Sequence, residues 1–202
     1  MTDPAVVVFV VDDDASVREA LSGLIRSIGL NVIVFASAAE FLSFRRPDAP
    51  SCLVLDVRLP GLSGLELQRD LRNAGEYLPV IFITGHGDIP MSVRAMKAGA
   101  VEFLPKPFRE QDLLDAISLA LARDSKARNQ RAEIEDTRKA MNRLTMRERQ
   151  VMDGLLGGML NKQVAARLGI SDVTVKLHRR HLLEKMSVSS LVELARMIER
   201  IR

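Results

Sequence analysis

Acidic side chains stand at the ends of apolar runs in the first half of the sequence. Asp12 and Asp13 follow one such run and Asp56 ends another, while Thr84 and Lys106 come at the ends of two more. Carboxylates that lie together repel one another unless a hard cation such as Mg²⁺ lies among them. One carboxylate can then act as a nucleophile toward a phosphoryl donor, while the metal, an ammonium and a hydroxyl neutralise the phosphoryl oxygens. These residue types therefore predict metal-assisted phosphoryl chemistry.

This chemistry requires that these five side chains lie close together in the folded protein. The pattern of the surrounding sequence predicts a fold that brings them together. Short β-rich runs alternate with helical patterns through residues 1–121, at 5–11, 31–35, 51–56, 78–84 and 101–104. Strands that are apolar almost throughout are typical of parallel strands covered by helices on both faces. We expect a doubly wound α/β domain with a parallel five-stranded sheet. The carboxyl ends of such strands share one crevice, which is where this fold binds ligands.

The remainder of the chain differs in charge and in pattern. Residues 1–121 carry 11 Lys+Arg and 16 Asp+Glu, whereas residues 122–202 carry 18 and 10. A basic half suggests a polyanionic partner. Residues 122–142 contain no Gly or Pro and few large apolar residues, which predicts a helical linker that continues the preceding helix. Residues 143–202 have a purely helical pattern, so we expect three parts: an α/β domain at 1–121, the linker, and a small all-α domain.

The helical pattern of the third part is specific. Thr145 and Glu148 have capping-box spacing. A short helix is predicted at about 161–168, Gly169 supplies a turn, and Ser171 can cap the helix that follows. Two short helices joined by a glycine turn in a basic segment predict a helix-turn-helix that binds double-stranded DNA.

The two faces of the predicted second helix have different compositions. At 100° per residue, one stripe is apolar and belongs in the core: Val175, Leu182 and Met186. The opposite face carries Leu177 between Lys176 and Arg180. An exposed leucine between two cations suits the major groove, where it can touch a thymine methyl while the cations reach bases or phosphates.

Overall composition bounds the class of protein. Hydrophobic residues make up 47% of the 202 and charged residues 27%, which is too apolar for a disordered chain. Cys52 is the only cysteine, which excludes an internal disulfide and a multi-cysteine metal site. No run approaches the ~18 apolar residues of a membrane span, so we expect a soluble cytoplasmic protein without membrane association.

The motifs of the first part resemble a known family. VVDDD at 10–14, LVLD with VRLPGLSG at 53–64, ITGHGD at 83–88 and FLPKPF at 103–108 resemble the receiver domain of two-component response regulators, which has a flavodoxin-like fold. The segment from LTMRERQ to EKMSV resembles the LuxR-type helix-turn-helix. Together they resemble the FixJ branch of the NarL/FixJ response regulators.

The resemblance implies roles for the receiver residues. Asp56 would be the phosphoacceptor, Asp13 a direct Mg²⁺ ligand and Asp12 a ligand through water. The metal would also take the backbone carbonyl of Arg58. Thr84 and Lys106 would contact the phosphoryl group and Phe103 would be the aromatic switch, with a cis peptide at Lys106-Pro107.

For the DNA-binding part, the family's base-contacting positions correspond to Lys176, Leu177 and Arg180. Thr174, Arg179 and Lys162 are candidate phosphate contacts. We expect His178 to pack at the margin of its helix.

The expected function follows from both parts. A sensor histidine kinase would phosphorylate Asp56, which would promote a homodimer through residues 88–104. The dimer would bind a roughly palindromic DNA site and control transcription, mainly as an activator that works with RNA polymerase. We do not expect a separate enzymatic activity beyond Mg²⁺-dependent phosphotransfer to the receiver and its self-dephosphorylation, with Arg58 and His86 beside the route of the hydrolytic water.

Two other interpretations stay open. The receiver could regulate without phosphorylation, through partner binding or constitutive dimers. An Asp nucleophile with Mg²⁺ also describes phosphatases of the haloacid dehalogenase type, but these need a second Asp two residues after the nucleophile, where this sequence has Arg58.

Overall fold

The computed structural model describes residues 6–85 and 89–201. The chain divides into two compact units, Met1–Arg128 and Asn129–Arg202. The division falls inside the range 122–142 that the sequence pattern assigns to the linker. Among the described residues, no helix has a stretch long and apolar enough to cross a membrane.

The first unit contains a five-stranded sheet in which all neighbouring strands are parallel. Its order is β2-β1-β3-β4-β5. The strands are β1 (Val7–Val11), β2 (Asn31–Phe35), β3 (Ser51–Asp56), β4 (Val80–Thr84) and β5 (Glu102–Pro105). Three of them, β1, β3 and β4, are buried along their whole length, because helices cover both faces of the sheet. The predicted doubly wound fold is thus confirmed.

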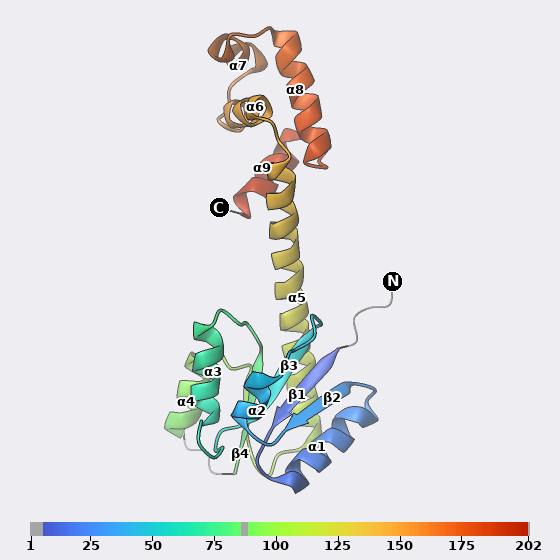
Figure 1. Cartoon of the computed structure of the whole chain (residues 1–202), viewed down its shortest axis with the longest axis vertical. Helices are drawn as coiled ribbons and strands as arrows, with labels where there is room; N and C mark the ends of the chain where they lie inside the picture. Colours follow the sequence, from blue (N-terminus) through green and yellow to red (C-terminus); the bar gives the residue numbers. More distant parts are fainter. Residues whose placement is uncertain (1–5, 86–88, 202) are drawn as a thin grey trace. The chain divides into compact units, whose positions relative to one another are not determined.

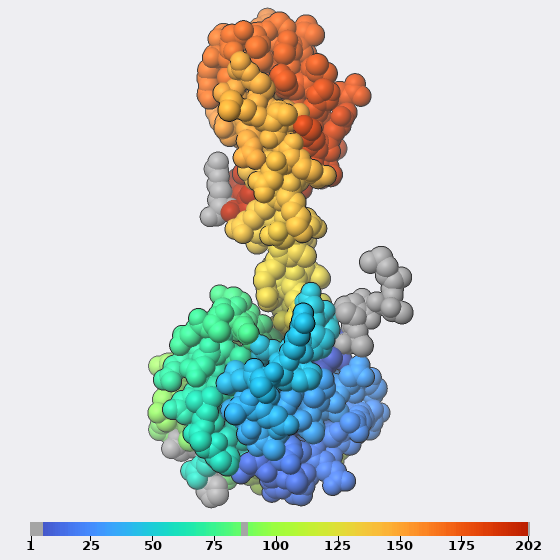
Figure 2. Space-filling view, viewed as in Figure 1, coloured from blue at the N-terminus to red at the C-terminus, as the bar shows by residue number. Residues whose placement is uncertain are grey.

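Within the described residues, five helices lie wholly or in part in this unit (Figure 1). They are α1 (Ala15–Ser27), α2 (Ala38–Ser43), α3 (Gly64–Asn73), α4 (Ile89–Lys97) and α5 (Glu110–Asn142). Alternate strand residues enter two separate cores: Val8, Val10 and Cys52 pack with α1 and α5, whereas Val7, Phe9 and Leu53 pack with α2, α3 and α4. Figure 2 shows α2 and α3 at the surface of this unit, over the second of these cores.

The long helix α5 is continuous from Glu110 to Asn142, as the absence of Gly and Pro predicted. Its middle is tied to the first unit by a buried carboxylate. Asp124 is 2% exposed. Its carboxylate accepts a hydrogen bond from the Ser51 backbone N–H at 2.9 Å and another from Arg128 Nε at 2.6 Å. Arg128 also pairs with Asp48. These contacts explain why the first compact unit extends past residue 121 to Arg128.

The second unit is helical. After the end of α5 it contains α6 (Met146–Leu156), α7 (Asn161–Leu168), α8 (Asp172–Lys185) and α9 (Leu191–Glu199). The capping box of Thr145 and Glu148 is present, and Gly169 ends α7 in the left-handed conformation, with φ 66°. The predicted helix-turn-helix pair corresponds to α7 and α8.

The core of the second unit confirms the predicted stripe on α8. Val175 and Leu182 are fully buried and Met186 is 1% exposed. Val175 packs with α6 and α7, while Leu182 and Met186 pack with α6, α9 and the end of α5. The stripe thus fixes which face of α8 points outward.

Candidate functional site

The strand register brings the predicted acidic residues together. Val11 of β1 lies opposite Leu55 of β3, so Asp12 and Asp56 follow on adjacent strands. On the other side of β3, Asp56 pairs with Ile83, the residue before Thr84. Thr84 in turn lies opposite Pro105, the residue before Lys106. Parallel pairing therefore places all four side chains at one edge of the sheet.

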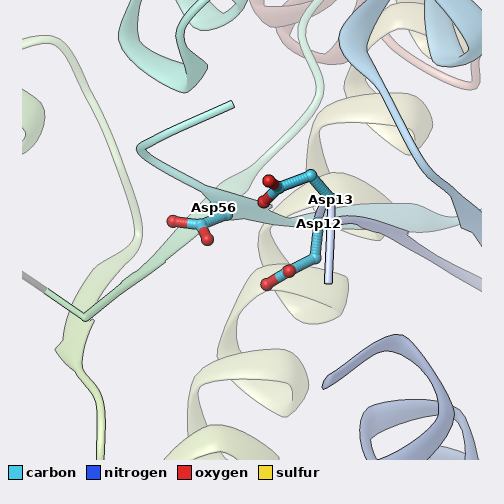
Figure 3. Close-up of side chains that lie close together, drawn as sticks. All are labelled: Asp12, Asp13 and Asp56. Atoms are coloured by element: carbon cyan, nitrogen blue, oxygen red, sulfur yellow. The ribbon is translucent and has the colours of Figure 1, made fainter. Parts of the chain in front are cut away.

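The carboxylates form one cluster. Ligand oxygens of Asp12, Asp13 and Asp56 lie within 4.8 Å of one another, and Figure 3 shows the three side chains extending from the ends of β1 and β3 into one region. Asp12 is fully buried and Asp56 is 8% exposed, whereas Asp13 is exposed. Oxygens on one octahedral Mg²⁺ lie about 3–4 Å apart. The donor set therefore fits a hard divalent cation after a small movement of the exposed Asp13 side chain.

Lys106 reaches into this cluster. Its Nζ donates to Asp12 Oδ2 at 2.7 Å and to Asp56 Oδ2 at 3.2 Å. Its backbone N–H donates to the Thr84 carbonyl at 2.7 Å, which anchors the residue to β4. Burial alone would lower the pKa of Lys106, but the contacts with Asp12 and Asp56 outweigh it and raise the pKa. The side chain is a fixed positive charge beside the Asp56 carboxylate.

The Asp56 carboxylate is mostly buried, with its side chain 11% exposed. Burial raises the pKa of Asp56, and the nearby Asp12 charge adds to this. The Arg58 backbone N–H, which donates to Asp56 Oδ1 at 3.1 Å, and Lys106 act in the opposite direction. Partial desolvation of a carboxylate at an open edge of the sheet suits a nucleophile.

The remaining predicted receiver residues lie around this cluster. Thr84 is fully buried. Phe103 is half-buried against the core, with its ring centroid 6.4 Å from that of Phe82. The peptide bond Lys106-Pro107 is cis, as the resemblance implied. His86 lies outside the described residues, as does Asp88 at the start of the expected dimer face.

Two supporting residues had no assigned role from the sequence. The Arg18 guanidinium donates to the Asp12 carbonyl at 2.7 Å. Gly64, the first residue of α3, lies so close to β3 that a Cβ there would be 2.3 Å from the Asp56 carbonyl oxygen. No local pattern signals either contact, because both join segments that only the fold brings together.

The second candidate site is the outward face of α8. Val173 is 74% exposed and Leu177 is 50% exposed, and they lie one turn apart. Lys176 Nζ is 2.8 Å from Asp172 Oδ2, and Arg180 Nε is 2.8 Å from Glu184 Oε1. The acids were not assigned a role from the sequence, although their i,i+4 spacing with the cations signals such pairs.

The other predicted DNA contacts lie nearby in the helix-turn-helix. Thr174 shares a hydrogen bond of 2.8 Å with the Ser171 hydroxyl, and its backbone N–H donates to the same oxygen. Lys162 is exposed in the first turn of α7, and Arg179 is half-buried. His178 is also half-buried, with Nδ1 enclosed and without a hydrogen-bond partner among the described residues.

An exposed apolar ridge between cations is unusual for a solvated helix face. In a major groove, the same ridge meets thymine methyls while cations reach base acceptors and phosphates. The geometry of α8 therefore suits a recognition helix.

Comparison with known proteins assigns each part of the chain to a family. Residues 8–118 match the response regulator receiver domain, and residues 142–198 match the bacterial regulatory proteins of the luxR family. The chain is 53% identical over 193 residues to Nodulation protein W of Bradyrhizobium diazoefficiens, covering 96% of this chain and 85% of that protein. It is 44% identical to the transcriptional regulatory protein FixJ of Azorhizobium caulinodans, and the match covers 94% of this chain and 90% of that protein.

Solved structures give the same result. The response regulator StyR, 50% identical, superimposes with a TM-score of 0.88 over 97% of this chain and 99% of that one. Full-length FixJ from B. japonicum is 38% identical to this chain and superimposes with a TM-score of 0.57 over 96% of each chain. With an acidic cluster in one unit and a helix-turn-helix in the other, the chain belongs to the FixJ-type response regulators of two-component systems, which bind DNA through a LuxR-type helix-turn-helix.

Proposed function

We propose that a sensor histidine kinase transfers a phosphoryl group to Asp56 and that the phosphorylated protein dimerises and activates transcription in the cytoplasm. The observation that carries this proposal is the position of Lys106, whose Nζ lies 2.7 Å from Asp12 and 3.2 Å from Asp56. A lysine bridging two carboxylates at a sheet edge provides the positive charge that an acyl phosphate on Asp56 requires.

The acidic cluster would hold Mg²⁺, with Asp13 and Asp56 as direct ligands, Asp12 through water and Arg58 through its backbone carbonyl. When bound, the metal supplies positive charge to the phosphoryl oxygens during transfer and during self-dephosphorylation. Lys106 pairs with a second phosphoryl oxygen and the Thr84 hydroxyl donates to a third. Arg58, two residues beyond the acceptor, stands beside the route of the hydrolytic water.

Phosphorylation adds about −2 charge at Asp56. Drawing Thr84 toward the phosphoryl group opens space into which Phe103 turns, which changes the face formed by residues 88–104. Apolar side chains are exposed on the described part of this face: Ile89 is 81%, Val93 44% and Met96 43% exposed. This surface would pair with the same surface of a second copy, because burial of exposed apolar area favours association.

The dimer would place two α8 helices on the half-sites of a roughly palindromic DNA. Lys176, Leu177 and Arg180 would contact bases, and Thr174, Arg179 and Lys162 would contact phosphates. In this assembly Asp172 and Glu184 hold the cations along the helix until the more negative DNA replaces them. Activation then follows from contact of the bound dimer with RNA polymerase.

Selection from a random DNA pool tests the proposal. Wild type and Asp56→Asn are compared with and without beryllofluoride and Mg²⁺, which mimic the phosphoryl group. We expect a two-fold-related motif to be enriched only by treated wild type. A Lys176→Gln, Arg180→Gln variant, treated identically, should dimerise without enriching the motif.

Equal enrichment by all four wild-type and Asp56→Asn samples would overturn control through Asp56 and favour regulation without phosphorylation. Enrichment by the recognition-helix variant would overturn the assignment of α8.

A further inference from the structure

Helices α3 and α4 border a pocket that the proposed function does not use. Its volume is about 460 Å³, and residues of α3 and of the end of α4 line it. Figure 1 shows the two helices next to each other in the first unit. This volume lies within the range of small-molecule sites, about 300–1,000 Å³. The question is therefore which chemical class of ligand its lining recognises.

The charge of the lining is mostly positive. Arg69, Arg72 and Arg94 line the pocket, with Glu66 as the acid among the lining residues. The Glu66 carboxylate accepts hydrogen bonds from the Ser63 hydroxyl at 2.7 Å and from the Ser63 backbone N–H at 3.0 Å. These bonds lower the pKa of Glu66 and hold its carboxylate at the start of α3. The arginines therefore determine the sign of the ligand.

A buried amide gives the pocket a second polar feature. Gln68 lines it and is 4% exposed. Its side chain makes no hydrogen bond with any described residue. Neither of its two amide atoms is fully buried, so a molecule in the pocket can reach them. A buried polar group without a partner is costly, so such groups in folded proteins nearly always bond to protein, water or ligand. Gln68 is thus positioned to bond to a pocket occupant.

One arginine is already fixed in place. Arg72 Nη1 donates to the backbone carbonyl of Ala98, just past the end of α4. This bond ties α3 to α4 at the pocket, and the guanidinium has further N–H donors for a ligand. Leu65 and Ala98 add apolar surface to the lining.

We propose that this pocket binds a small organic anion. The carboxylate or phosphate of the ligand pairs with Arg69 and Arg94, and its uncharged body lies against Leu65 and Ala98. The Gln68 amide bonds to a polar atom of the bound ligand. Because the site joins α3, which follows Asp56, to α4, which follows Thr84, an occupant contacts the two helices next to the phosphoacceptor strands.

Solution NMR of the full-length chain tests this proposal with three probes. Benzoate carries a carboxylate on an apolar body, benzamide is its uncharged counterpart, and inorganic phosphate is an anion without an apolar body. We expect benzoate to shift the Gln68 side-chain amide signal saturably, and benzamide to leave it unchanged. Phosphate should bind more weakly than benzoate at the same residues.

Variants locate the binding site. Arg69→Gln combined with Arg94→Gln should weaken benzoate binding about tenfold, because charge-assisted hydrogen bonds are lost. Arg26→Gln, an exposed arginine on α1, is the matched control and should bind as wild type does. Both arginines replaced are exposed, so an unchanged thermal transition is expected for each variant.

Each outcome decides the matter. Absence of a saturable shift with benzoate and with phosphate overturns the proposal, as does equal binding by the double variant. If benzamide binds as tightly as benzoate, the proposed recognition of an anion is wrong. If phosphate binds and benzoate does not, the proposed contact of an apolar ligand body with the pocket is wrong.

Discussion

Lys106 contacts both Asp12 and Asp56 and thereby holds together two carboxylates that would otherwise repel each other. Its backbone is held by the bond from its N–H to the Thr84 carbonyl. At the scale of single residues, the receiver site is thus a set of charges whose positions are fixed by backbone contacts.

Gly64 tests how closely the site depends on one backbone contact. A Cβ at this position would lie 2.3 Å from the Asp56 carbonyl oxygen, so Gly64→Ala must displace the end of β3. We expect a loss of about 1–3 kcal/mol in unfolding free energy together with slower phosphorylation of Asp56. Tyr77 is the only tyrosine and the chain has no tryptophan, so tyrosine fluorescence during urea denaturation follows the first unit.

Gly23→Ala is the control for this substitution. A Cβ at Gly23 meets nothing within 4 Å, and alanine inside a helix is favoured over glycine by about 1 kcal/mol. This variant should be as stable as wild type or more so. Equal stability of Gly64→Ala and wild type would contradict the predicted clash.

Glu148 gives the second unit a predictable pH dependence. It is 3% exposed and accepts hydrogen bonds from Lys185 Nζ and from the Thr145 backbone N–H, both at 2.7 Å. Burial alone would raise the pKa of Glu148, but these bonds outweigh it and lower the pKa below the usual 4.5. The stabilisation from the carboxylate is therefore present above pH 4.5 and is lost as the pH falls through the lowered pKa.

Comparison with Glu148→Gln measures this contribution. We expect the variant to be less stable at pH 7 by about 1 kcal/mol, and the difference to shrink in acid, where wild type is protonated as well. Urea denaturation followed by the methyl NMR signal of Leu182 reports on this unit. A difference that grows as the pH falls would contradict the assignment.

At the scale of secondary structure, parallel strands bring the acidic site together, and one long helix contributes to the cores of both units. The ends of β1, β3, β4 and β5 bring the acids, Thr84 and Lys106 to one edge of the sheet. Helix α5 packs on the sheet through Leu113, Ile117 and Ala120, and its later residues contribute Ala140 to the core of the second unit. Asp124 ties this helix to the start of β3 through the Ser51 backbone N–H.

Removal of the Asp124 carboxylate should loosen this anchor. Asp124→Ala leaves the Ser51 N–H without its acceptor and Arg128 without one of its two partners. We expect the free energy of unfolding to fall by about 1–3 kcal/mol, as measured by tyrosine fluorescence during urea denaturation. Asp136→Ala, whose side chain is 78% exposed on the same helix, should change the stability by less than about 0.5 kcal/mol. Similar effects of the two changes would rule out a specific anchor.

At the scale of the whole molecule, an acidic receiver domain is joined to a basic domain of the luxR family. Phosphorylation changes DNA binding only if it changes what the receiver contacts. The exposed apolar residues of α4 are the described features that suit a contact between two copies of the chain.

Val93→Arg tests this contact. A cation in the centre of the paired surface should weaken beryllofluoride-driven dimerisation about tenfold or more, as measured by sedimentation velocity. Binding of beryllofluoride at Asp56, followed by ¹⁹F NMR, should be unchanged. Leu42→Arg, at a 48% exposed position on α2, is the matched control and should dimerise normally. Normal dimerisation of Val93→Arg would exclude this face.

The sequence alone determined the features that depend on local patterns. Alternating apolar runs predicted the parallel sheet, and residues at the strand ends predicted the acidic cluster, because parallel strands share one carboxyl edge. Capping residues and the stripe of Val175, Leu182 and Met186 predicted the helix-turn-helix and the outward face of α8. Backbone preference and hydrophobic periodicity are local properties, so they can be read without the fold.

Only the tertiary structure decided which distant side chains meet. The bond from Ser51 to Asp124 joins residues 73 apart in sequence, and the bond from Lys106 to Asp12 joins residues 94 apart. The close approach of Gly64 to Asp56 and the pocket of Gln68 and the arginines likewise depend on how helices pack on the sheet. Such contacts have no local signature, because they follow from packing between segments whose separation along the chain carries no information about their distance in space.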